Sequence, residues 1–536
     1  MADDNADIVI IGAGHNGLVC ASYLAAAGLK VRIVERRAVV GGAAVTEEFH
    51  PGFRNSVASY TVSLLNPKVI DDLDLHGHGL KIVERDISNF YPLGTGSGDY
   101  LKLTFDTERT QAEFARFSAR DAAALPAYYE AIEQAADVLR SLVLETPPNI
   151  GGGPVNIWRA IKTGARFRRL ALAEQQLLLD LFAKSAAEFL GQWFEHPSVI
   201  AAFAFDGIVG AYASPHTPGT AYVLLHHAFG EVNGQKGRWG HAIGGMGAIT
   251  QAMRKAAEQR GVVMTTEAPV RQVVTENGRA TGVLLENGDI VRARAVAANV
   301  NPKLLFTKLV AREAQPDAFR TRMAQYACGS GTFRMNVALS ALPDFSCLPG
   351  AEAAEHHRAG IIIGPTVDYL ERAYLDARRK GWSRAPVIEI LLPSTTDATL
   401  APPGQHVASL FCQQFAPELP GGRSWDDARE EAADLIIDTV NQYAPNFKAS
   451  VIGRQILSPL DLERVFGLTG GDIFHGRLSL DQMFSARPAL GSADYRTPVK
   501  GLYLCGSGAH PGGGVTGAPG HNAAREIIRD FRMRRA

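Results

Sequence analysis

Three glycines near the N-terminus have the spacing that binds a pyrophosphate. Gly12, Gly14 and Gly17 form a Gly-x-Gly-x-x-Gly motif. In such a motif the first glycine permits a tight turn, the second lets a pyrophosphate approach the backbone, and the third lets a helix pack closely on a strand. The free N–H groups and the positive end of the following helix attract phosphates. His15 and Asn16 lie inside the motif, so we assign them to the same ligand.

An acidic residue follows at the spacing that binds a ribose. Glu35 ends the second apolar segment, 18 residues after the third glycine. Its carboxylate can accept hydrogen bonds from both ribose hydroxyls, and its charge disfavours a 2′-phosphate. Gly41 and Gly42 come next, and a second close approach of the backbone fits a cofactor longer than ADP. We therefore predict FAD rather than NAD, and we assign Arg36 and Ala43 to the same site.

Two further glycine-rich segments are expected to return the chain to this cofactor. Gly244-Gly-Met-Gly247 precedes a predicted helix and strands, where the backbone at Val270 would meet the adenine, and Asn299 follows these strands. A second loop precedes the last helix, whose N-terminus suits a flavin that gains negative charge on reduction. The residues assigned to FAD from this loop are Gly506, Ser507, Gly514, Val515, Thr516 and Ala518. The alternative for the first segment is an ordinary αβ segment with hairpins, and the alternative for the second is a tight structural loop.

One polar cluster outside these motifs is a candidate for catalysis. Asp472 and His475 share a glycine-rich run, and their spacing could aim an imidazole that titrates near neutrality at a reacting carbon. The alternative is that His475 caps a helix or binds a carbonyl. His226 and His227 are adjacent, so their rings diverge, and no acidic residue accompanies them at ligand spacing. No metal site is predicted.

These residues need a scaffold of alternating strands and helices. Apolar β-branched runs predict buried strands at 7–11 and 31–35 around a helix at 18–27. Asn277-Gly and Asn287-Gly predict two hairpin turns. The other expected helices are 110–119, 125–144, 156–167, 173–191, 248–259, 424–444 and 521–531, and the other expected strands are 261–266, 268–274, 332–339, 360–363, 387–392, 406–412 and 501–506. Between the helices, the apolar stripe from Leu177 is more typical of core packing than of membrane contact.

The pattern predicts an α/β fold with two domains. A Rossmann-type FAD-binding domain would be assembled from discontinuous segments, residues 1–94, 237–302 and 491–536. Residues 95–236 and 303–490 would form a mixed-sheet plus helical substrate domain. A chain of 536 residues is also longer than a single core usually grows.

Composition excludes several classes of protein. The 54 Lys and Arg nearly cancel the 55 Asp and Glu, so no bulk charge would hold nucleic acid. The five cysteines form no Cys-x-x-Cys pair and are typical of reduced thiols in the cytoplasm. No apolar run is long enough to span a bilayer, and a strand beginning at about residue 7 leaves no room for a signal peptide. Peripheral membrane contact and a homo-oligomer stay open.

The motifs quoted above, with Pro51 to Tyr60 and Gly467 to Gly476, resemble the phytoene desaturase branch of the flavin-dependent amine oxidase superfamily. The resemblance extends to the group named after pyridine nucleotide-disulfide oxidoreductase domain-containing protein 2. It implies a non-covalent FAD and a tunnel that brings a lipophilic or otherwise bulky substrate to the isoalloxazine. It also implies that Tyr60 lies near the flavin, as a second catalytic candidate whose alternative is a packing role. The sequence has neither the disulfide of that group's name nor a second nucleotide-binding motif, so reduction by a pyridine nucleotide is not expected.

The predicted function is an FAD-dependent dehydrogenase or desaturase. Hydride would move from a substrate C–H to flavin N5, a base would remove a second proton, and oxygen, a quinone or another acceptor would take the electrons. One alternative is a flavin-dependent isomerase or saturase without net oxidation, and another is a non-catalytic flavoprotein scaffold. The intact glycine sets argue against the scaffold, because only a bound cofactor requires such permissive backbone. Polyenes, retinoids, fatty or aromatic compounds and amines stay open as substrates.

Overall fold

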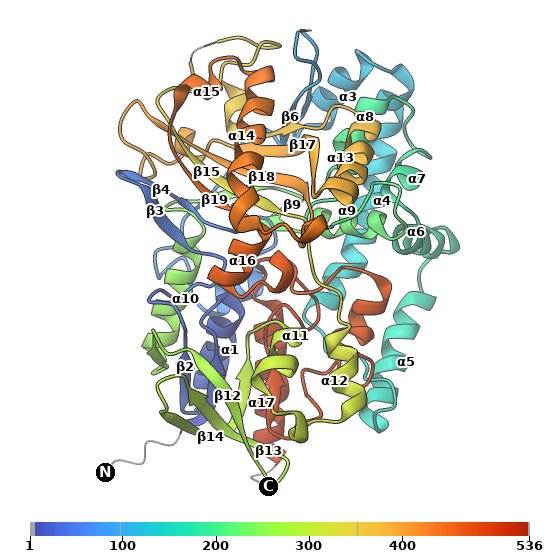
Figure 1. Ribbon diagram of the computed structural model, residues 1–536. Coiled ribbons are helices and arrows are strands. Elements are labelled where there is room, and N and C mark those ends of the chain that lie inside the picture. Colours follow the sequence, from blue (N-terminus) through green and yellow to red (C-terminus); the bar gives the residue numbers. More distant parts are fainter. Residues whose placement is uncertain (1–5, 97, 351, 534–536) are drawn as a thin grey trace.

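Two seven-stranded sheets dominate the computed structural model, which describes residues 6–96, 98–350 and 352–533 (Figure 1). In Figure 1 the first sheet and its helices occupy the lower half, and the second sheet lies in the upper half. The first sheet has the order β11-β2-β1-β14-β13-β12, with β20 beside β14. Its strands are β1 (Ala6–Ile11), β2 (Val31–Val34), β11 (Val263–Thr265), β12 (Val270–Glu276), β13 (Arg279–Leu285), β14 (Ile290–Ala298) and β20 (Leu502–Leu504). The predicted α/β fold is confirmed.

The centre of the first sheet is parallel and buried on both faces. β1 pairs with β2 and β14 in parallel, and its apolar residues Ile8, Val9 and Ile10 are fully buried. Helices α1 (His15–Ala26), α10 (Gly247–Gln259) and α17 (Ala518–Met533) pack beside it. Gly28, with φ of +84°, follows α1 as predicted, because a left-handed residue is cheapest as glycine. The two predicted Asn-Gly turns join β12 to β13 and β13 to β14.

The second sheet is mixed and has the order β19-β15-β18-β17-β16-β6-β7. Its strands are β6 (Asn89–Pro92), β7 (Tyr100–Leu103), β15 (Phe333–Leu339), β16 (Gly360–Ile363), β17 (Trp382–Leu391), β18 (His406–Phe415) and β19 (Val451–Leu457). Helices α13 (Val367–Lys380) and α14 (Trp425–Tyr443) pack on it. Ser424 caps α14 by accepting the Asp426 N–H at 3.1 Å, which fixes where that helix begins.

The chain passes between the two halves at different points from those expected. β6 pairs with β16 in the second sheet, although it falls within the segment 1–94. Conversely, Leu305, Phe306 and Met323 belong to the core beneath the first sheet, although they follow residue 302. Long-range pairing and packing decide both positions, so local sequence patterns carry no signal for them.

Most of the remaining helices lie in the half of the molecule that holds the second sheet. They are α3 (Thr107–Ala115), α4 (Ala119–Val143), α6 (Leu172–Ala183), α7 (Ala186–Leu190), α8 (Pro197–Ala204) and α9 (Thr220–Ala228). Helix α5 (Pro154–Arg168) lies lower in Figure 1, where Arg159 forms an ion pair with Glu526 of α17. Shorter elements are α2 (Pro67–Asp72), α11 (Pro302–Leu304), α12 (Asp317–Ala324), α15 (Phe447–Ser450), α16 (Pro459–Phe466), β3 (Thr46–His50), β4 (Phe53–Ser56), β5 (Ile82–Glu84), β8 (Glu231–Val232), β9 (Gln235–Lys236) and β10 (Gly240–Ala242). Within the described residues, none of the helices combines the length and apolarity needed to cross a membrane.

Two of the predicted helix boundaries are wrong, and serine caps explain both. The helix expected at 110–119 ends at Ala115, because Ser118 accepts the Asp121 N–H and starts α4. The helix expected at 173–191 is two helices, because Ser185 accepts the Glu188 N–H and starts α7. A serine followed three residues later by an acid is a recognised start signal that apolar periodicity alone overlooks.

Candidate functional site

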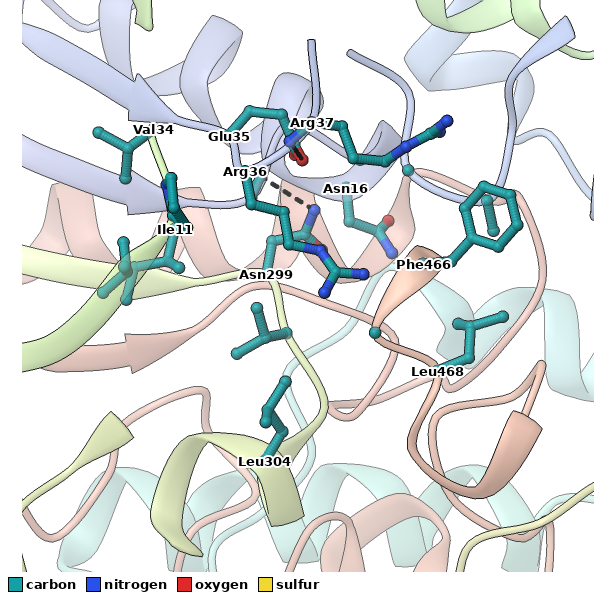
Figure 2. Close-up of a pocket in the computed structure, with 18 of the residues that line it drawn as sticks. Ile11, Asn16, Val34, Glu35, Arg36, Arg37, Asn299, Leu304, Phe466 and Leu468 are labelled. Atoms are coloured by element: carbon teal, nitrogen blue, oxygen red, sulfur yellow. Dashed lines mark hydrogen bonds between the residues drawn. The ribbon is translucent and has the colours of Figure 1, made fainter. Parts of the chain in front are cut away.

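A cavity of about 330 Å³ opens beyond the carboxyl ends of β1, β2 and β14 (Figure 2). Ligands of open parallel sheets bind at such an edge. The residues assigned to the cofactor from the sequence that line this cofactor cavity are Gly12, Gly14, His15, Asn16, Glu35, Arg36, Gly42, Ala43, Val270, Asn299 and Ser507. Segments that are far apart in the sequence therefore meet around one space.

The two glycine motifs fold against each other at this cavity. The Gly41 N–H donates to the Ala13 carbonyl at 2.9 Å, and Gly42, at φ of +59°, lies over Gly14. A Cβ atom on Gly14 would lie 3.0 Å from Asn299 Nδ2. At Gly17 a side chain would collide with the Gly12 carbonyl, which is the close packing of helix on strand that the motif predicts.

Glu35 borders the cavity with a fixed carboxylate. Its Oε2 accepts the Ala13 N–H at 2.8 Å, and its Oε1 accepts the Arg37 N–H at 2.9 Å. Each oxygen can accept a further hydrogen bond, so ribose hydroxyls remain acceptable partners. Figure 2 shows Arg36 and Arg37 beside it, and Arg36 Nη2 donates to the Arg464 carbonyl at 3.0 Å.

Four buried polar atoms of residues that line the cavity have no partner among the described residues: His15 Nε2, Asn16 Oδ1, Arg37 Nη1 and His475 Nδ1. Desolvation lowers the pKa of His15 to about 4 and that of His475 to about 3, so both rings are neutral near pH 7. Buried polar atoms without partners are rare in folded proteins and costly. A polar group bound in the cavity would satisfy them, so these residues fit a dinucleotide.

Asp472 holds the loop of His475 through backbone hydrogen bonds, and its catalytic role stays a prediction. Its carboxylate accepts the N–H groups of Gly329 and Phe474, each at 2.8 Å, and it borders none of the cavities described here. It holds the loop on which His475 sits at φ of +55°, a left-handed backbone that costs a non-glycine residue free energy. The imidazole lies in the cofactor cavity, so it faces the predicted cofactor rather than a separate substrate space.

Several residues assigned from the sequence do not line the cofactor cavity. They are Gly17, Gly41, Gly506, Gly514, Val515, Thr516 and Ala518. Gly506 packs on Asn299, and Ala518 begins α17 with its N–H donated to Thr516 Oγ1 at 3.1 Å. Gly514 and Val515 instead line a second, smaller cavity, of about 100 Å³.

This second cavity lies at the junction of the two sheets, and Tyr60 is the polar residue of most chemical interest in its wall. Trp239, Phe411 and Phe474 also line it. The Tyr60 hydroxyl donates to Glu389 Oε2 at 2.5 Å. The Arg334 guanidinium lies 4.5 Å from the centre of the Tyr60 ring.

Burial controls the protonation states of Tyr60 and Glu389. Desolvation and the neighbouring Glu389 carboxylate raise the pKa of Tyr60 well above its usual range. Desolvation also raises the pKa of Glu389, while the guanidinium of Arg85 lowers it. Arg334 is buried, and its Nε and Nη1 have no partner among the described residues. A proton therefore rests on Tyr60, beside an acceptor carboxylate and a buried cation.

A third cavity, of about 300 Å³, adjoins the second and shares His227 and Trp239 with it. It lies among α3, α4 and the segment that follows α8. Glu133 and Lys236, whose side chains are 41% and 48% exposed, mark its outer side. The third cavity thus adjoins the second and lies nearer the surface. We name them the inner and outer cavities.

Sequence reasoning missed several residues around these cavities. Phe466 and Leu468, at the end of α16, and Leu304 border the cofactor cavity (Figure 2). Phe466 adjoins the conspicuous glycine run at Gly467, which was the only available signal. No sequence signal pointed to Glu389, because the role of an acidic residue within an apolar strand becomes clear only when its partner in space is known. Among the described residues, no cluster of His, Cys, Asp and Glu could hold a metal ion.

Comparisons of sequence place the chain among flavoproteins. Residues 17–332 match the flavin-containing amine oxidoreductase family. The chain is 43% identical to pyridine nucleotide-disulfide oxidoreductase domain-containing protein 2 of Rattus norvegicus, over 98% of this chain and 94% of that protein. It is 25% identical to one of the subunits of limonene dehydrogenase from Castellaniella defragrans, over 98% and 95% of the two chains. It is 26% identical to the lycopene-forming phytoene desaturase of Pseudescherichia vulneris, over 95% and 96%.

Solved structures share the fold. An oxidoreductase from Methanosarcina mazei superposes with a TM-score of 0.60 at 17% identity, over 97% of this chain and 99% of that chain. Cyclohexylamine oxidase from Brevibacterium oxydans superposes with a TM-score of 0.55 at 16% identity, over 98% and 100%. The chain therefore belongs to the flavin-containing amine oxidoreductase family and is a flavin-dependent oxidoreductase.

Proposed function

We propose that the protein is an FAD-dependent dehydrogenase or desaturase of a bulky, lipophilic substrate. FAD would be bound without a covalent link in the cofactor cavity, and the substrate would occupy the inner cavity. One observation carries the proposal. Gly514 and Val515, from the loop assigned to the flavin, border the same cavity as Tyr60, whose hydroxyl donates a hydrogen bond to Glu389 behind the cavity wall.

The residues of the cofactor cavity suit each part of FAD. Gly12 and Gly14 leave space for a pyrophosphate at the N-terminus of α1, and Glu35 can accept hydrogen bonds from the ribose. His15, Asn16 and their neighbours offer polar atoms that are otherwise unpaired. The bound flavin would supply two-electron redox chemistry.

The inner cavity would handle the proton that leaves the substrate. Tyr60 oxygen would accept this proton while the Tyr60 hydroxyl proton moves to Glu389 Oε2, along the existing 2.5 Å hydrogen bond. The positive charge of Arg334 over the ring would stabilise negative charge that develops on the phenolic oxygen. Trp239 and Phe411 would exclude water from the reacting carbon.

The walls and the relatives support a lipophilic substrate. The inner cavity is mostly apolar and shares His227 and Trp239 with the outer cavity, so a long molecule that passes between these side chains could occupy both. Two relatives are named for reactions on the hydrocarbons limonene and phytoene. We propose that oxygen, a quinone or another small acceptor takes the electrons, since no second nucleotide-binding motif is seen in the sequence.

The test is the visible absorption spectrum of the purified protein, before and after denaturation, followed by anaerobic addition of terpenes, polyenes, fatty aldehydes and amines. Flavin bands released by denaturation and bleached by one compound class would support the proposal. Protein that stays colourless after incubation with FAD would refute it. Product formation without bleaching at any stage would replace the dehydrogenase with an isomerase.

Variants separate catalysis from cofactor binding. Y60F and E389Q should bind FAD normally and slow flavin bleaching by about 100-fold, the usual contribution of one acid–base group. Tyr100→Phe, which changes a tyrosine outside the three cavities, should bleach at the wild-type rate. Equal rates for Y60F and the wild type would remove Tyr60 from the reaction.

A further inference from the structure

Asp206 is a carboxylic acid that lines the outer cavity. It follows α8 and is only partly buried, because it borders that cavity. Among the described residues, none donates a hydrogen bond to its carboxylate. Enclosed carboxylates are normally paired or hydrogen-bonded, so an acid left open to a cavity points to a ligand.

Five aromatic residues contribute to the walls around Asp206. Phe105, Tyr128, Tyr129, Phe203 and Trp239 line the same cavity. The charged residues Glu133 and Lys236 lie only at its outer side, where their side chains are 41% and 48% exposed. Besides Asp206, the outer cavity is lined by uncharged polar residues, Ser88, Asn89, Thr104, Thr107 and His227, so Asp206 is the acidic group of its inner part.

Two charged residues near Asp206, Arg85 and Glu389, leave its carboxylate able to accept a hydrogen bond from a ligand. The charge of Glu389 raises the pKa of Asp206 and that of Arg85 lowers it, but within the described part of the chain Arg85 and Asp206 are not close enough to form an ion pair. Arg85 is instead held by Thr61, to which its Nη2 donates at 2.7 Å. Burial raises the pKa of Asp206 to about 7, and a donor from the ligand would favour its ionised form.

We infer that the outer cavity binds the polar end of the substrate, a hydroxyl or ammonium group that donates hydrogen bonds to the Asp206 carboxylate. The rest of the molecule, which is apolar, passes His227 and Trp239 into the inner cavity, where the proposed oxidation takes place. This inference rests on the proposed function. It makes the substrate an amphiphile, unlike the plain hydrocarbons for which two relatives are named.

The other end groups fit this cavity less well. A carboxylate would place two like charges together where solvent does not screen them. A hydrocarbon end would bury Asp206 without any partner, which costs more than leaving it hydrated. An ammonium would gain from the aromatic rings as well as from the carboxylate, whereas a hydroxyl would gain the hydrogen bond alone.

The test is isothermal titration calorimetry of the FAD-loaded protein with octanol, octylamine, octanoate and octane. These probes share one chain and differ only in the end group. Octanol or octylamine should bind at least about tenfold more tightly than octane, and octanoate more weakly than either. The tighter of the two donors identifies the end group. Equal binding of octane and both donors, or tightest binding of octanoate, would overturn the inference.

Variants tie this preference to one side chain. D206L should lose the preference for both donors, and D206N should lose it for octylamine while keeping part of it for octanol, because an amide oxygen still accepts. Asp180→Asn removes a carboxylate of α6 outside the cavity, where it pairs with Lys184, and should change nothing. Unchanged circular dichroism and flavin spectra would show that each variant is folded. A preference that survives in folded D206L would refute the role of Asp206.

The two proposals can fail separately. Calorimetry measures binding and does not require flavin reduction. Selective binding of a donor without any bleaching would refute the proposed oxidation and leave the binding site. Flavin bleaching by compounds whose affinity does not depend on their end group would support the proposed oxidation and refute the binding site at Asp206.

Discussion

Gly14 lies where one added methyl group would separate a pyrophosphate from the backbone. Its φ of −69° suits any residue, so an alanine would not strain the chain. Its Cβ atom would nevertheless lie 3.0 Å from Asn299 Nδ2 and stand at the cofactor cavity. We expect G14A to weaken FAD binding at least about tenfold while changing the free energy of unfolding by less than about 1 kcal/mol. Flavin fluorescence titration and urea unfolding would measure the two quantities.

Gly153 is the matched control for this substitution. It also precedes a helix, with φ of −67°, and a Cβ atom there would meet nothing within 4 Å. G153A should therefore bind FAD like the wild type. Wild-type affinity in G14A would mean that the pyrophosphate does not lie against this turn.

At the scale of elements, Arg487 joins the loop of His475 to the loop that follows β20. Its guanidinium is fully buried and donates to the carbonyls of Ser507 and Phe474, each at 2.7 Å, and to that of Gln482 at 3.0 Å. Among the described residues it forms no ion pair with a carboxylate. Its hydrogen bonds therefore hold together two loops that both reach the cofactor cavity.

Removal of this guanidinium should loosen both loops together. R487M leaves several buried carbonyls unpaired, so we expect it to lower the free energy of unfolding by about 3–5 kcal/mol and to weaken FAD binding. R487K should restore little of the stability or of the FAD affinity, because a lysine ammonium cannot reproduce the planar set of donors of a guanidinium. Urea unfolding and FAD titration of both variants would test this. Full rescue by lysine would show that charge, and not geometry, is what the loops require.

Local patterns predicted the first sheet well and the inner cavity poorly. The strand, glycine turn and helix around Gly14 follow from apolar runs and backbone freedom within a few residues. Tyr60 and Glu389 are separated by 329 positions, and only the pairing of β17 in the second sheet brings them together. β6 likewise belongs to the second sheet because it pairs with β16, a strand far away in the sequence. Contacts between distant segments are set by the fold as a whole, so single motifs cannot reveal them.

At the scale of the whole molecule, burial of neutral histidines should make the protein sensitive to acid. Desolvation lowers the pKa of His475 to about 3, of His15, His227 and His510 to about 4, and of His226 well below its usual value. Below the unfolded value of about 6.5, only the unfolded chain takes up these protons. The histidines therefore lower the free energy of unfolding as the pH falls from about 6.5 to 4.

Buried acids act in the opposite direction but are fewer. Burial raises the pKa of Asp206 to about 7 and raises those of Glu389 and Asp472, so these groups stabilise the fold as the pH falls below those values. Since each histidine costs up to about 1.4 kcal/mol per pH unit, the histidines should prevail. We expect a lower urea midpoint at about pH 5.5 than at about pH 7.5. A midpoint that rises on acidification would show that the acids dominate.

The surface around helix α5 is apolar and basic, although the net charge of the whole chain is close to zero. The inner side of this helix is held by ion pairs, Arg159 with Glu526 at 2.7 Å and Arg166 with Glu145 at 2.9 Å. Its outer side exposes Ile157, Trp158 and Ile161 by 58%, 62% and 65%. Figure 1 shows α5 at the edge of the molecule. Residues 149–173 contain Arg159, Lys162, Arg166, Arg168 and Arg169 and no acidic residue, and the first three form ion pairs with Glu526 or Glu145.

A helix with apolar residues on one side and basic residues around them is typical of contact with an anionic membrane surface. We therefore expect the protein to sediment with vesicles that contain phosphatidylserine, more weakly at high salt, and not with phosphatidylcholine alone. W158S and I161S together should weaken this binding at least about tenfold, because they remove the inserted apolar area. Leu480→Ser, which changes an equally exposed residue elsewhere, should not. Loss of a dimer, rather than of vesicle binding, in the W158S/I161S variant would show that a second copy covers this helix instead.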